Sequence, residues 1–303
     1  MRIGVAATPQ VAIPTLDWLL TTDHELALVI TQPDKPAGRG RELKQSPVSE
    51  WAGIHGVTTL KPESSASLVE HLESLDVVIT IGYGVILPES ILKLPKFGFI
   101  NLHFSLLPAY RGAAPVQRAI ENGEEVTGLT VFQLDKGMDT GPVFTSMAVN
   151  IEPQWRSHEA LEHLAQLGPV AISSSLESIS LGVKPQAQAG QATMAPKISK
   201  AEAEINWRHN NRTIVNKIRA FYPAPCAWTL WNGTAVKITN ARIHDAIEEL
   251  EPGQVLFHNK KLLVGAENSC AVELVSVIPS GKNEMAAADW ARGAHLHGGE
   301  YFG

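Results

Sequence analysis

One segment of the chain concentrates polar side chains that can do chemistry, residues 99–120 with the sequence FINLHFSLLPAYRGAAPVQRAI. Asn101 and His103 alternate with apolar residues, so on a strand both side chains leave the same face near its carboxyl end. Asp139 follows in the segment LDKGMDTGPV, residues 134–143, on an expected loop between two strands. If that loop returns to the strand end, an amide, an imidazole and a carboxylate converge, a set that donates hydrogen bonds and moves a proton.

Each of these three residues also has a purely structural interpretation. A single histidine on a strand is typical of a hydrogen-bonded core residue, and an aspartate among glycines is typical of a turn. Together they favour a functional site, because ligands of open α/β sheets bind at the carboxyl ends of the strands.

The elements that would position this site follow an α/β rhythm. Apolar runs alternate with helix-like stretches through about the first 150 residues, which predicts a doubly wound, mostly parallel, Rossmann-like sheet flanked by helices. We expect strands over residues 3–7, 26–31, 76–81, 98–102, 128–134 and 143–151, and helices over residues 9–20 and 158–179.

The composition changes after residue 180. The segment LGVKPQAQAGQATMAPKISK, residues 181–200, is rich in Gly, Ala, Pro and Gln without periodicity, which is typical of a surface linker. Beyond a helix near residues 211–221, short apolar runs bounded by turn signals predict a small antiparallel, OB-like barrel. We therefore expect an N-terminal domain over 1–180, a linker over 181–207 and a C-terminal domain over 208–303.

Length and composition agree with a folded two-domain protein. The chain has 303 residues, 44% of them hydrophobic and 18% charged. Two cysteines are too few for a disulfide framework or a four-ligand zinc site, so we expect no metal. The chain has neither a run of about 18 apolar residues nor an N-terminal signal pattern, so we expect a cytoplasmic protein with no membrane partner.

Two nucleotide motifs are missing from the sequence. The loop after the first expected strand, AATPQ, replaces the G-x-G-x-x-G pattern of dinucleotide-binding folds, which disfavours a nicotinamide cofactor. The P-loop pattern is absent too, because the one Gly-Lys pair, at 281 and 282, is followed by Asn283.

Residues 101–115 read N-x-H-x-S-L-L-P-x-Y-R-G-x-x-P and are followed by G-M-D-T-G-P, a combination that closely resembles the formyltransferases that use 10-formyltetrahydrofolate. The resemblance implies transfer of a formyl group to an amine through a tetrahedral intermediate. It also implies that Asn101 and His103 donate hydrogen bonds to the oxygen of that intermediate. Asp139 would hold the tautomer of the imidazole or favour its protonated form, with water as a possible proton relay.

The same resemblance implies a folate site on two segments. The SLLP segment would form one wall and IGYGVILP, residues 81–88, the other, while the competing interpretation treats these side chains as plain core. Phe104 stands where many relatives have glycine, which leaves the shape of the formyl pocket open. The expected folate-binding residues are Ser105, Leu106, Leu107, Pro108, Tyr83, Ile86 and Leu87.

A basic segment points to the acceptor. Residues 31–48, TQPDKPAGRGRELKQSPV, carry basic side chains among Pro and Gly, and resemble the loop of the family members that formylate initiator methionyl-tRNA. The linker end and the C-terminal barrel extend that resemblance over essentially the whole chain, and we expect a monomer. The expected tRNA contacts are Lys35, Arg39, Arg41, Lys44, Lys197 and Lys200.

The charge distribution is compatible with a polyanionic partner for part of the chain. The formal net charge is −6, with −7 over residues 1–207 and +1 over residues 208–303. Three alternatives stay open: a solvated basic loop with no partner, a folate-dependent formyltransferase acting on a small amine such as an amino sugar or glycinamide nucleotide, and an RNA-binding module with a vestigial folate pocket.

Overall fold

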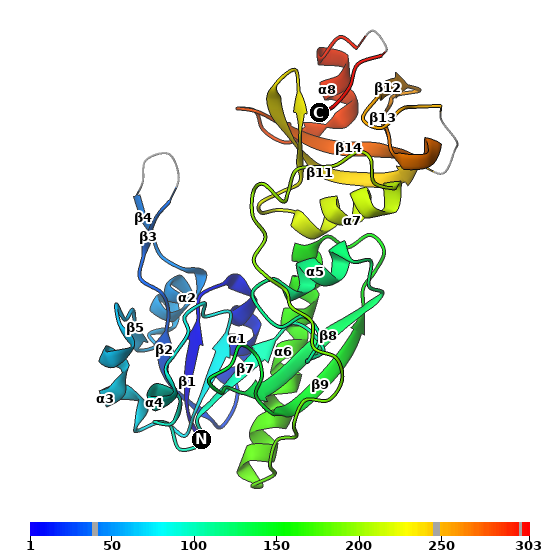
Figure 1. Ribbon diagram of the computed structural model, residues 1–303. Helices are drawn as coiled ribbons and strands as arrows, with labels where there is room; N and C mark the ends of the chain where they lie inside the picture. Colours follow the sequence, from blue (N-terminus) through cyan, green and yellow to red (C-terminus); the bar gives the residue numbers. More distant parts are fainter. Residues whose placement is uncertain (38–41, 245–248, 297–298) are drawn as a thin grey trace. The chain divides into compact units, whose positions relative to one another are not determined.

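The computed structural model describes residues 1–37, 42–244, 249–296 and 299–303, which form two compact units (Figure 1). The units do not follow the order of the chain, because two short segments that precede residue 161 belong to the second unit. The expected boundaries at residues 180 and 208 stay a prediction. Unit 1 comprises Met1–Pro115, Val126–Asn150 and Leu161–Pro196, and unit 2 comprises Val116–Glu125, Ile151–Ala160 and Lys197–Gly303.

Unit 1 is built on a seven-stranded sheet among the described residues, in the order β5-β2-β1-β6-β7-β8-β9. Neighbouring strands are parallel from β5 to β7, whereas β8 and β9 are antiparallel, which confirms the expected mostly parallel sheet. The strands are β1 (Arg2–Ala7), β2 (Glu25–Ile30), β5 (Thr59–Leu60), β6 (Val77–Ile81), β7 (Phe99–His103), β8 (Val126–Gln133) and β9 (Val143–Asn150).

The strand order reverses at β1, because β2 follows on one side of it and β6 lies on the other. Ligands of open α/β sheets bind at the carboxyl ends of strands near such a reversal. The strands β1, β6 and β7 end there with Ala7, Ile81 and His103. The sheet therefore brings the expected site residues of β7 to the edge where a site is expected.

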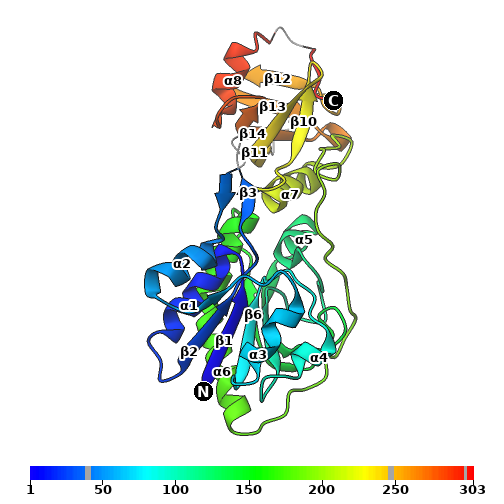
Figure 2. The ribbon, with the colours of Figure 1, turned by 90° about the vertical axis from the view of Figure 1, so that its left-hand side faces the viewer.

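Helices cover both faces of the sheet in unit 1, with α1 and α2 on one side and α3 and α4 on the other (Figure 2). On the second face, Phe99 of β7 packs with Leu72 and Leu92 in a buried core. On the first face, a Cβ built on Gly168 would touch Leu102, so α6 packs closely on β7 there. The helices of unit 1 are α1 (Ile13–Leu19), α2 (Pro47–His55), α3 (Val69–Leu72), α4 (Glu89–Leu92) and most of α6 (Ser157–Ser180). All of α5 (Pro115–Glu121) except Pro115 belongs to unit 2.

Strand alternation decides which face receives the polar side chains. Phe99, Asn101 and His103 leave the same face of β7, whereas Ile100 and Leu102 leave the other. The first expected helix begins later than residue 9, because a 3-10 turn over Gln10–Ala12 precedes α1.

Unit 2 contains an antiparallel sheet in the order β10-β11-β14-β13-β12, with β15 paired to β14. Its core is separate and gathers Ile218 of α7 with Ile238 and Val272 from the sheet. This arrangement confirms the expected antiparallel C-terminal fold. The elements are β10 (Trp228–Trp231), β11 (Thr234–His244), β12 (Val255–His258), β13 (Lys261–Gly265), β14 (Ala271–Pro279), β15 (Met285–Ala286), α7 (Asn211–Phe221) and α8 (Ala287–Gly293).

Two further findings bear on function. In the described part of the chain, no helix combines the length and apolar character needed to cross a bilayer. Within those same residues, no group of three or more His, Cys, Asp and Glu side chains is arranged to hold a metal ion.

Candidate active site

The site begins at the carboxyl end of β7, which is fixed on both sides. Its Asn101 pairs with Thr80 of the parallel strand β6 and with Phe132 of the antiparallel strand β8. The hydroxyl of Thr80 donates to the Ile100 carbonyl at 3.1 Å, adding a side-chain link between the strands. A pair of flanking strands gives the side chains of β7 a rigid base.

His103 is almost completely buried, with 7% of its surface exposed. Its Nε2 lies 2.9 Å from the Tyr110 carbonyl oxygen. Because a carbonyl only accepts, the proton of this bond belongs to Nε2. The other ring nitrogen, Nδ1, lies 3.8 Å from Oδ2 of Asp139, beyond direct hydrogen-bond distance.

Burial lowers the pKa of His103 below its ordinary value, and the Asp139 carboxylate and the Tyr110 carbonyl offset this only in part. The neutral imidazole is therefore favoured, with its proton on Nε2 and a lone pair on Nδ1. The carboxylate of Asp139 favours a proton on His103, but desolvation outweighs it. Two acceptors, Nδ1 and Oδ2, then face one another, an arrangement suited to a group that brings N–H bonds.

Asp139 is held by its backbone and by its side chain. Its φ of 54° lies in the left-handed region, which costs a non-glycine residue about 1–2 kcal/mol. Its Oδ2 accepts a hydrogen bond from the Gly112 amide at 2.7 Å. Earlier in the loop, Oδ1 of Asp135 accepts from the Gly137 amide at 2.9 Å and from the Thr140 hydroxyl at 2.7 Å. These bonds bring the loop to the strand end, as the sequence predicts.

Asn101 is half-buried on the same strand face as His103. Among the contacts of the described residues, its side-chain amide has no hydrogen-bond partner. The amide is thus free to donate to a ligand at the carboxyl end of β7. The structure brings His103 and Asp139 together and places Asn101 two residues away on one strand.

The SLLP segment wraps around a residue that the sequence did not single out. The buried hydroxyl of Thr130, on β8, donates to the Ser105 carbonyl at 2.7 Å and accepts from the Leu107 amide at 3.1 Å. The hydroxyl of Ser105 is itself bonded to the Ala109 carbonyl at 2.7 Å. Ser105 therefore shapes the turn, and Leu106 and Leu107 are left half-exposed. Pro108 and Phe104 are buried.

The three expected folate-binding residues that follow β6 differ in how far they are exposed. Tyr83 and Leu87 are buried in the core of unit 1, whereas Ile86 is 85% exposed. The Tyr83 carbonyl accepts from Nε2 of Gln32 at 2.7 Å and from the Thr8 hydroxyl at 3.3 Å. Tyr83 and Leu87 thus pack as core residues, and Ile86 presents apolar surface.

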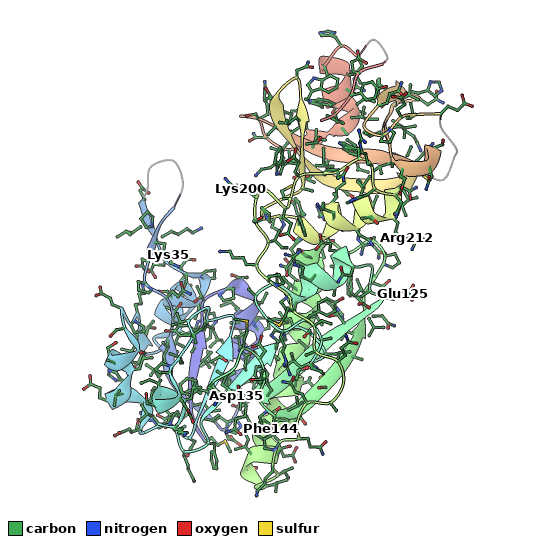
Figure 3. All side chains as sticks on the ribbon, viewed as in Figure 1. Lys35, Glu125, Asp135, Phe144, Lys200 and Arg212 are labelled. Carbon is green, nitrogen blue, oxygen red and sulfur yellow. The ribbon has the colours of Figure 1, made fainter. Side chains whose placement is uncertain are left out.

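The expected tRNA contacts fall in several places. Lys35 and Lys44 are exposed and pair in register in the hairpin of β3 (Lys35–Ala37) and β4 (Glu42–Lys44), where Figure 3 labels Lys35. Arg39 and Arg41 lie outside the described residues. Lys197 and Lys200 are exposed in unit 2.

Sequence reasoning missed Gln188, in the expected linker. Its Nε2 donates to the carbonyls of Asp139 and Gly141, each at 2.8 Å, and its Oε1 accepts from Nη2 of Arg111 at 2.6 Å. Composition hides this residue, because the surrounding sequence AQAGQA carries no periodic or motif signal. Arg111 lay inside the recognised motif but had no assigned role.

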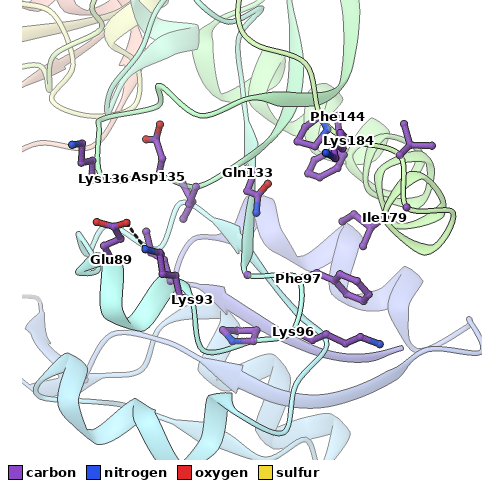
Figure 4. Close-up of a pocket in the computed structure, with 17 residues that line it drawn as sticks. Glu89, Lys93, Lys96, Phe97, Gln133, Asp135, Lys136, Phe144, Ile179 and Lys184 are labelled. Atoms are coloured by element: carbon purple, nitrogen blue, oxygen red, sulfur yellow. Dashed lines mark ion pairs between the residues drawn. The ribbon is translucent and has the colours of Figure 1, made fainter.

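A cavity of about 690 Å³ lies at the opposite, amino end of β7, between the segment before that strand and the end of β8 (Figure 4). It is lined by Phe97, Gln133 and several lysines, of which Lys93 pairs with Glu89 at 2.6 Å. None of Asn101, His103 and Asp139 lines it. The polar groups suited to catalysis are therefore separate from this cavity.

Both parts of the chain match the same class of protein. Residues 1–176 match the family described as formyl transferase, and residues 197–295 match the formyl transferase C-terminal domain. The chain is similar in fold to the crystal structure of HypX from Aquifex aeolicus in complex with tetrahydrofolic acid, with a TM-score of 0.69 at 17% sequence identity. The alignment covers 96% of this chain and 47% of the HypX chain. Fold and site together thus define a two-domain formyl transferase.

Relatives that align over nearly the full length of the chain identify its family more closely. The methionyl-tRNA formyltransferase of Pseudarthrobacter chlorophenolicus is 42% identical over 297 residues, covering 97% of both chains. That of Salinispora tropica is 40% identical over 307 residues, covering 99% of both. The chain belongs to the methionyl-tRNA formyltransferase family, whose members are formyl-transferring enzymes.

Proposed function

We propose that this chain transfers the formyl group of 10-formyltetrahydrofolate to the α-amine of methionine on initiator methionyl-tRNA, giving the formylmethionyl-tRNA that starts translation. The observation that carries the proposal is the buried, neutral His103 facing Asp139 beside the unpaired amide of Asn101. Full-length similarity to proteins named for this reaction supports the acceptor.

The reaction forms a bond between the methionyl nitrogen and the formyl carbon and breaks the bond from that carbon to N10 of the folate. The amine is a nucleophile itself, so no covalent bond to the protein is required. The formyl oxygen gains negative charge as the tetrahedral intermediate forms and loses it as the intermediate collapses. The free amide of Asn101 donates to that oxygen.

His103 and Asp139 handle the proton that the attacking amine must lose. Nδ1 of neutral His103 is a free acceptor, because Nε2 is bonded to the Tyr110 carbonyl. When Nδ1 takes the proton, the carboxylate of Asp139, 3.8 Å away, stabilises the imidazolium. The new Nδ1–H then donates to the charged oxygen or returns the proton to N10 of the leaving folate. The donor role expected for His103 thus begins after proton transfer.

The folate co-substrate fits the apolar surface at this edge of the sheet. Half-exposed Leu106 and Leu107 and exposed Ile86 come from loops at the carboxyl ends of neighbouring strands. These side chains contact the ring system, while Ser105, Pro108, Tyr83 and Leu87 hold the two loops in shape. Tetrahydrofolic acid in the HypX crystal structure supports a folate ligand for this fold.

The tRNA is held through its phosphates by the exposed basic residues of the hairpin and of unit 2. Such contacts position a helix and make affinity depend on salt, without reading bases. Lys35, Lys44, Lys197 and Lys200 contribute, together with Arg39 and Arg41. An enzyme acting on initiator tRNA works in the cytoplasm, and a monomeric state stays a prediction.

The experiment that tests the acceptor is formyl transfer from 10-formyltetrahydrofolate to charged initiator methionyl-tRNA. Uncharged tRNA, free methionine and an amino sugar nucleotide serve as parallel acceptors. Formylation of the charged tRNA alone is the expected result. Formylation of the small amine instead would replace this proposal with a small-amine formyltransferase.

A further inference from the structure

Residues 186–195 form a strap that pairs with two loops of the active site. At one end, the backbones of Gln186 and Val143 exchange hydrogen bonds of 2.8 and 2.6 Å. At the other end, the Arg111 amide donates to the Thr193 carbonyl at 2.9 Å, and the Ala195 amide donates to the Arg111 carbonyl at 2.6 Å. The strap thus joins the loop after β7 to the start of β9.

Gln188 links these two loops through its side chain. Its Nε2 donates to the carbonyls of Asp139 and Gly141, at 2.8 Å each, and its Oε1 accepts from Nη2 and Nε of Arg111 at 2.6 and 3.2 Å. Two donated and two accepted bonds use the full capacity of a primary amide. One side chain therefore ties the residue carrying the carboxylate to the loop after β7.

Both partners of His103 depend on this connection. Tyr110, whose carbonyl holds Nε2 of the imidazole, precedes Arg111 directly, and its amide donates to the Thr193 hydroxyl at 2.8 Å. Asp139, which faces Nδ1, has its own carbonyl bound by Gln188. The two sides of the imidazole are thus fixed relative to one another through the strap.

We infer that Gln188 is a positioning residue that keeps the carboxylate of Asp139 beside Nδ1 of His103 by bridging the Asp139 loop to Arg111. The inference rests on the catalytic roles proposed above for His103 and Asp139. Gln188 acts on the geometry of the pair and contacts no reacting atom.

The chemistry of the bridge requires an amide in particular. A glutamate at position 188 keeps the acceptor for Arg111 but turns a second carboxylate oxygen toward the carbonyls of Asp139 and Gly141, which have no proton to give. Gln188→Glu therefore retains the tie to Arg111, and with it the strap, while it repels the Asp139 loop. Gln188→Ala removes both links.

The first test compares steady-state kinetics of Gln188→Ala and Gln188→Glu with those of Gln186→Ala. Gln186 is the matched control, because it lies on the same strap and is exposed, and only its backbone is hydrogen-bonded there. We expect kcat to fall about 10- to 100-fold in both Gln188 variants, as misplacement of a catalytic group by about 1 Å does, with both KM values nearly unchanged. Gln186→Ala should behave as wild type.

The second test follows the imidazole directly, by NMR titration of His103 assigned with a His103→Gln sample. Asp139 is the one charged side chain facing this ring among the described residues, and its carboxylate raises the pKa of His103. Displacing the carboxylate should lower the pKa of His103 in both Gln188 variants, in the direction produced by Asp139→Asn. A purely structural role would lower the melting temperature without moving this titration.

Lower kcat with a shifted His103 titration supports the inference. An unmoved His103 titration in both Gln188 variants overturns it, whether or not kcat falls, and so does an unchanged kcat in both variants when Asp139→Asn lowers turnover. The readouts also separate the two proposals. If the titration shifts in the Gln188 variants while Asp139→Asn keeps wild-type turnover, Gln188 positions Asp139 as inferred and the catalytic assignment fails.

Discussion

The two ends of β7 differ in a way that bears on where catalysis occurs. The amino end opens into a cavity of about 690 Å³ with exposed lysines, among them Lys96 and Lys136. The carboxyl end holds His103 and Asp139, whose side chains are 8% and 16% exposed and whose partners fix them in place. Catalysis needs positioned groups in a desolvated setting more than it needs volume, so we propose the carboxyl end as the active one.

The largest effects should come from removing the groups at the carboxyl end. His103→Ala and Asn101→Ala should each lower kcat for formyl transfer about 10²- to 10³-fold, because each removes a donor or acceptor at the reacting centre. Lys96→Ala, at the amino end, is the control and should leave kcat unchanged. Near-normal turnover in either active-site variant, or a large loss in the control, would contradict catalysis at the carboxyl end of β7.

Asp139→Asn should give the next largest effect and shift the pH dependence. Activity requires neutral His103, so it falls as pH drops through the pKa of that residue. The Asp139 carboxylate raises this pKa, and its removal lowers it further. The acid limb of the kcat/KM profile should therefore move to lower pH, with kcat reduced about tenfold or more. An acid limb that stays in place would show that Asp139 does not act on His103.

Removing the hydroxyl of Thr130 should destabilise the turn that carries the SLLP segment. Thr130→Val removes the hydroxyl that bonds Ser105 and Leu107, leaving two backbone groups without this partner. We expect the free energy of unfolding to fall by about 1–3 kcal/mol and KM for the folate to rise more than KM for the tRNA. Denaturant unfolding and steady-state kinetics measure the two effects, and an equal rise in both KM values would contradict this placement of the folate.

The smallest effects should come from the basic hairpin, because the phosphate contacts that we propose there involve exposed lysines that salt would screen. Lys35→Ala combined with Lys44→Ala should weaken methionyl-tRNA binding several-fold at low salt. The slope of log affinity against log salt concentration should become shallower by about 1–2. Hydrolytic release of the formyl group to water should not change. A parallel loss in hydrolysis would place the hairpin in the catalytic reaction instead.

Much of the sheet could be predicted because hydrophobic periodicity is local. The expected strand over 76–81 is observed as β6 at Val77–Ile81, and the expected strand over 143–151 as β9 at Val143–Asn150. Asn101, His103 and Asp139 stood out because their residue types and motif context are distinctive. Gln188 did not, since its role depends on contacts with Arg111 and Asp139, 77 and 49 residues away in the chain.

Burial is the property that the sequence left open at several of the candidate residues. Tyr83 and Leu87 belong to the core of unit 1, and alternation along an irregular loop does not reveal which side chains turn inward. The protonation of His103 likewise depends on desolvation, which outweighs the opposing effect of Asp139. Sequence alone left both forms of the imidazole open.

Formyl transfer at the carboxyl end of β7 is tested most directly by its single-turnover rate to charged initiator methionyl-tRNA. The wild-type chain and His103→Ala are compared with both substrates saturating. We expect formylmethionyl-tRNA from the wild type and a rate about 10²-fold lower in the variant. No product from the wild type, or equal rates in the two proteins, would contradict formyl transfer at this end of β7.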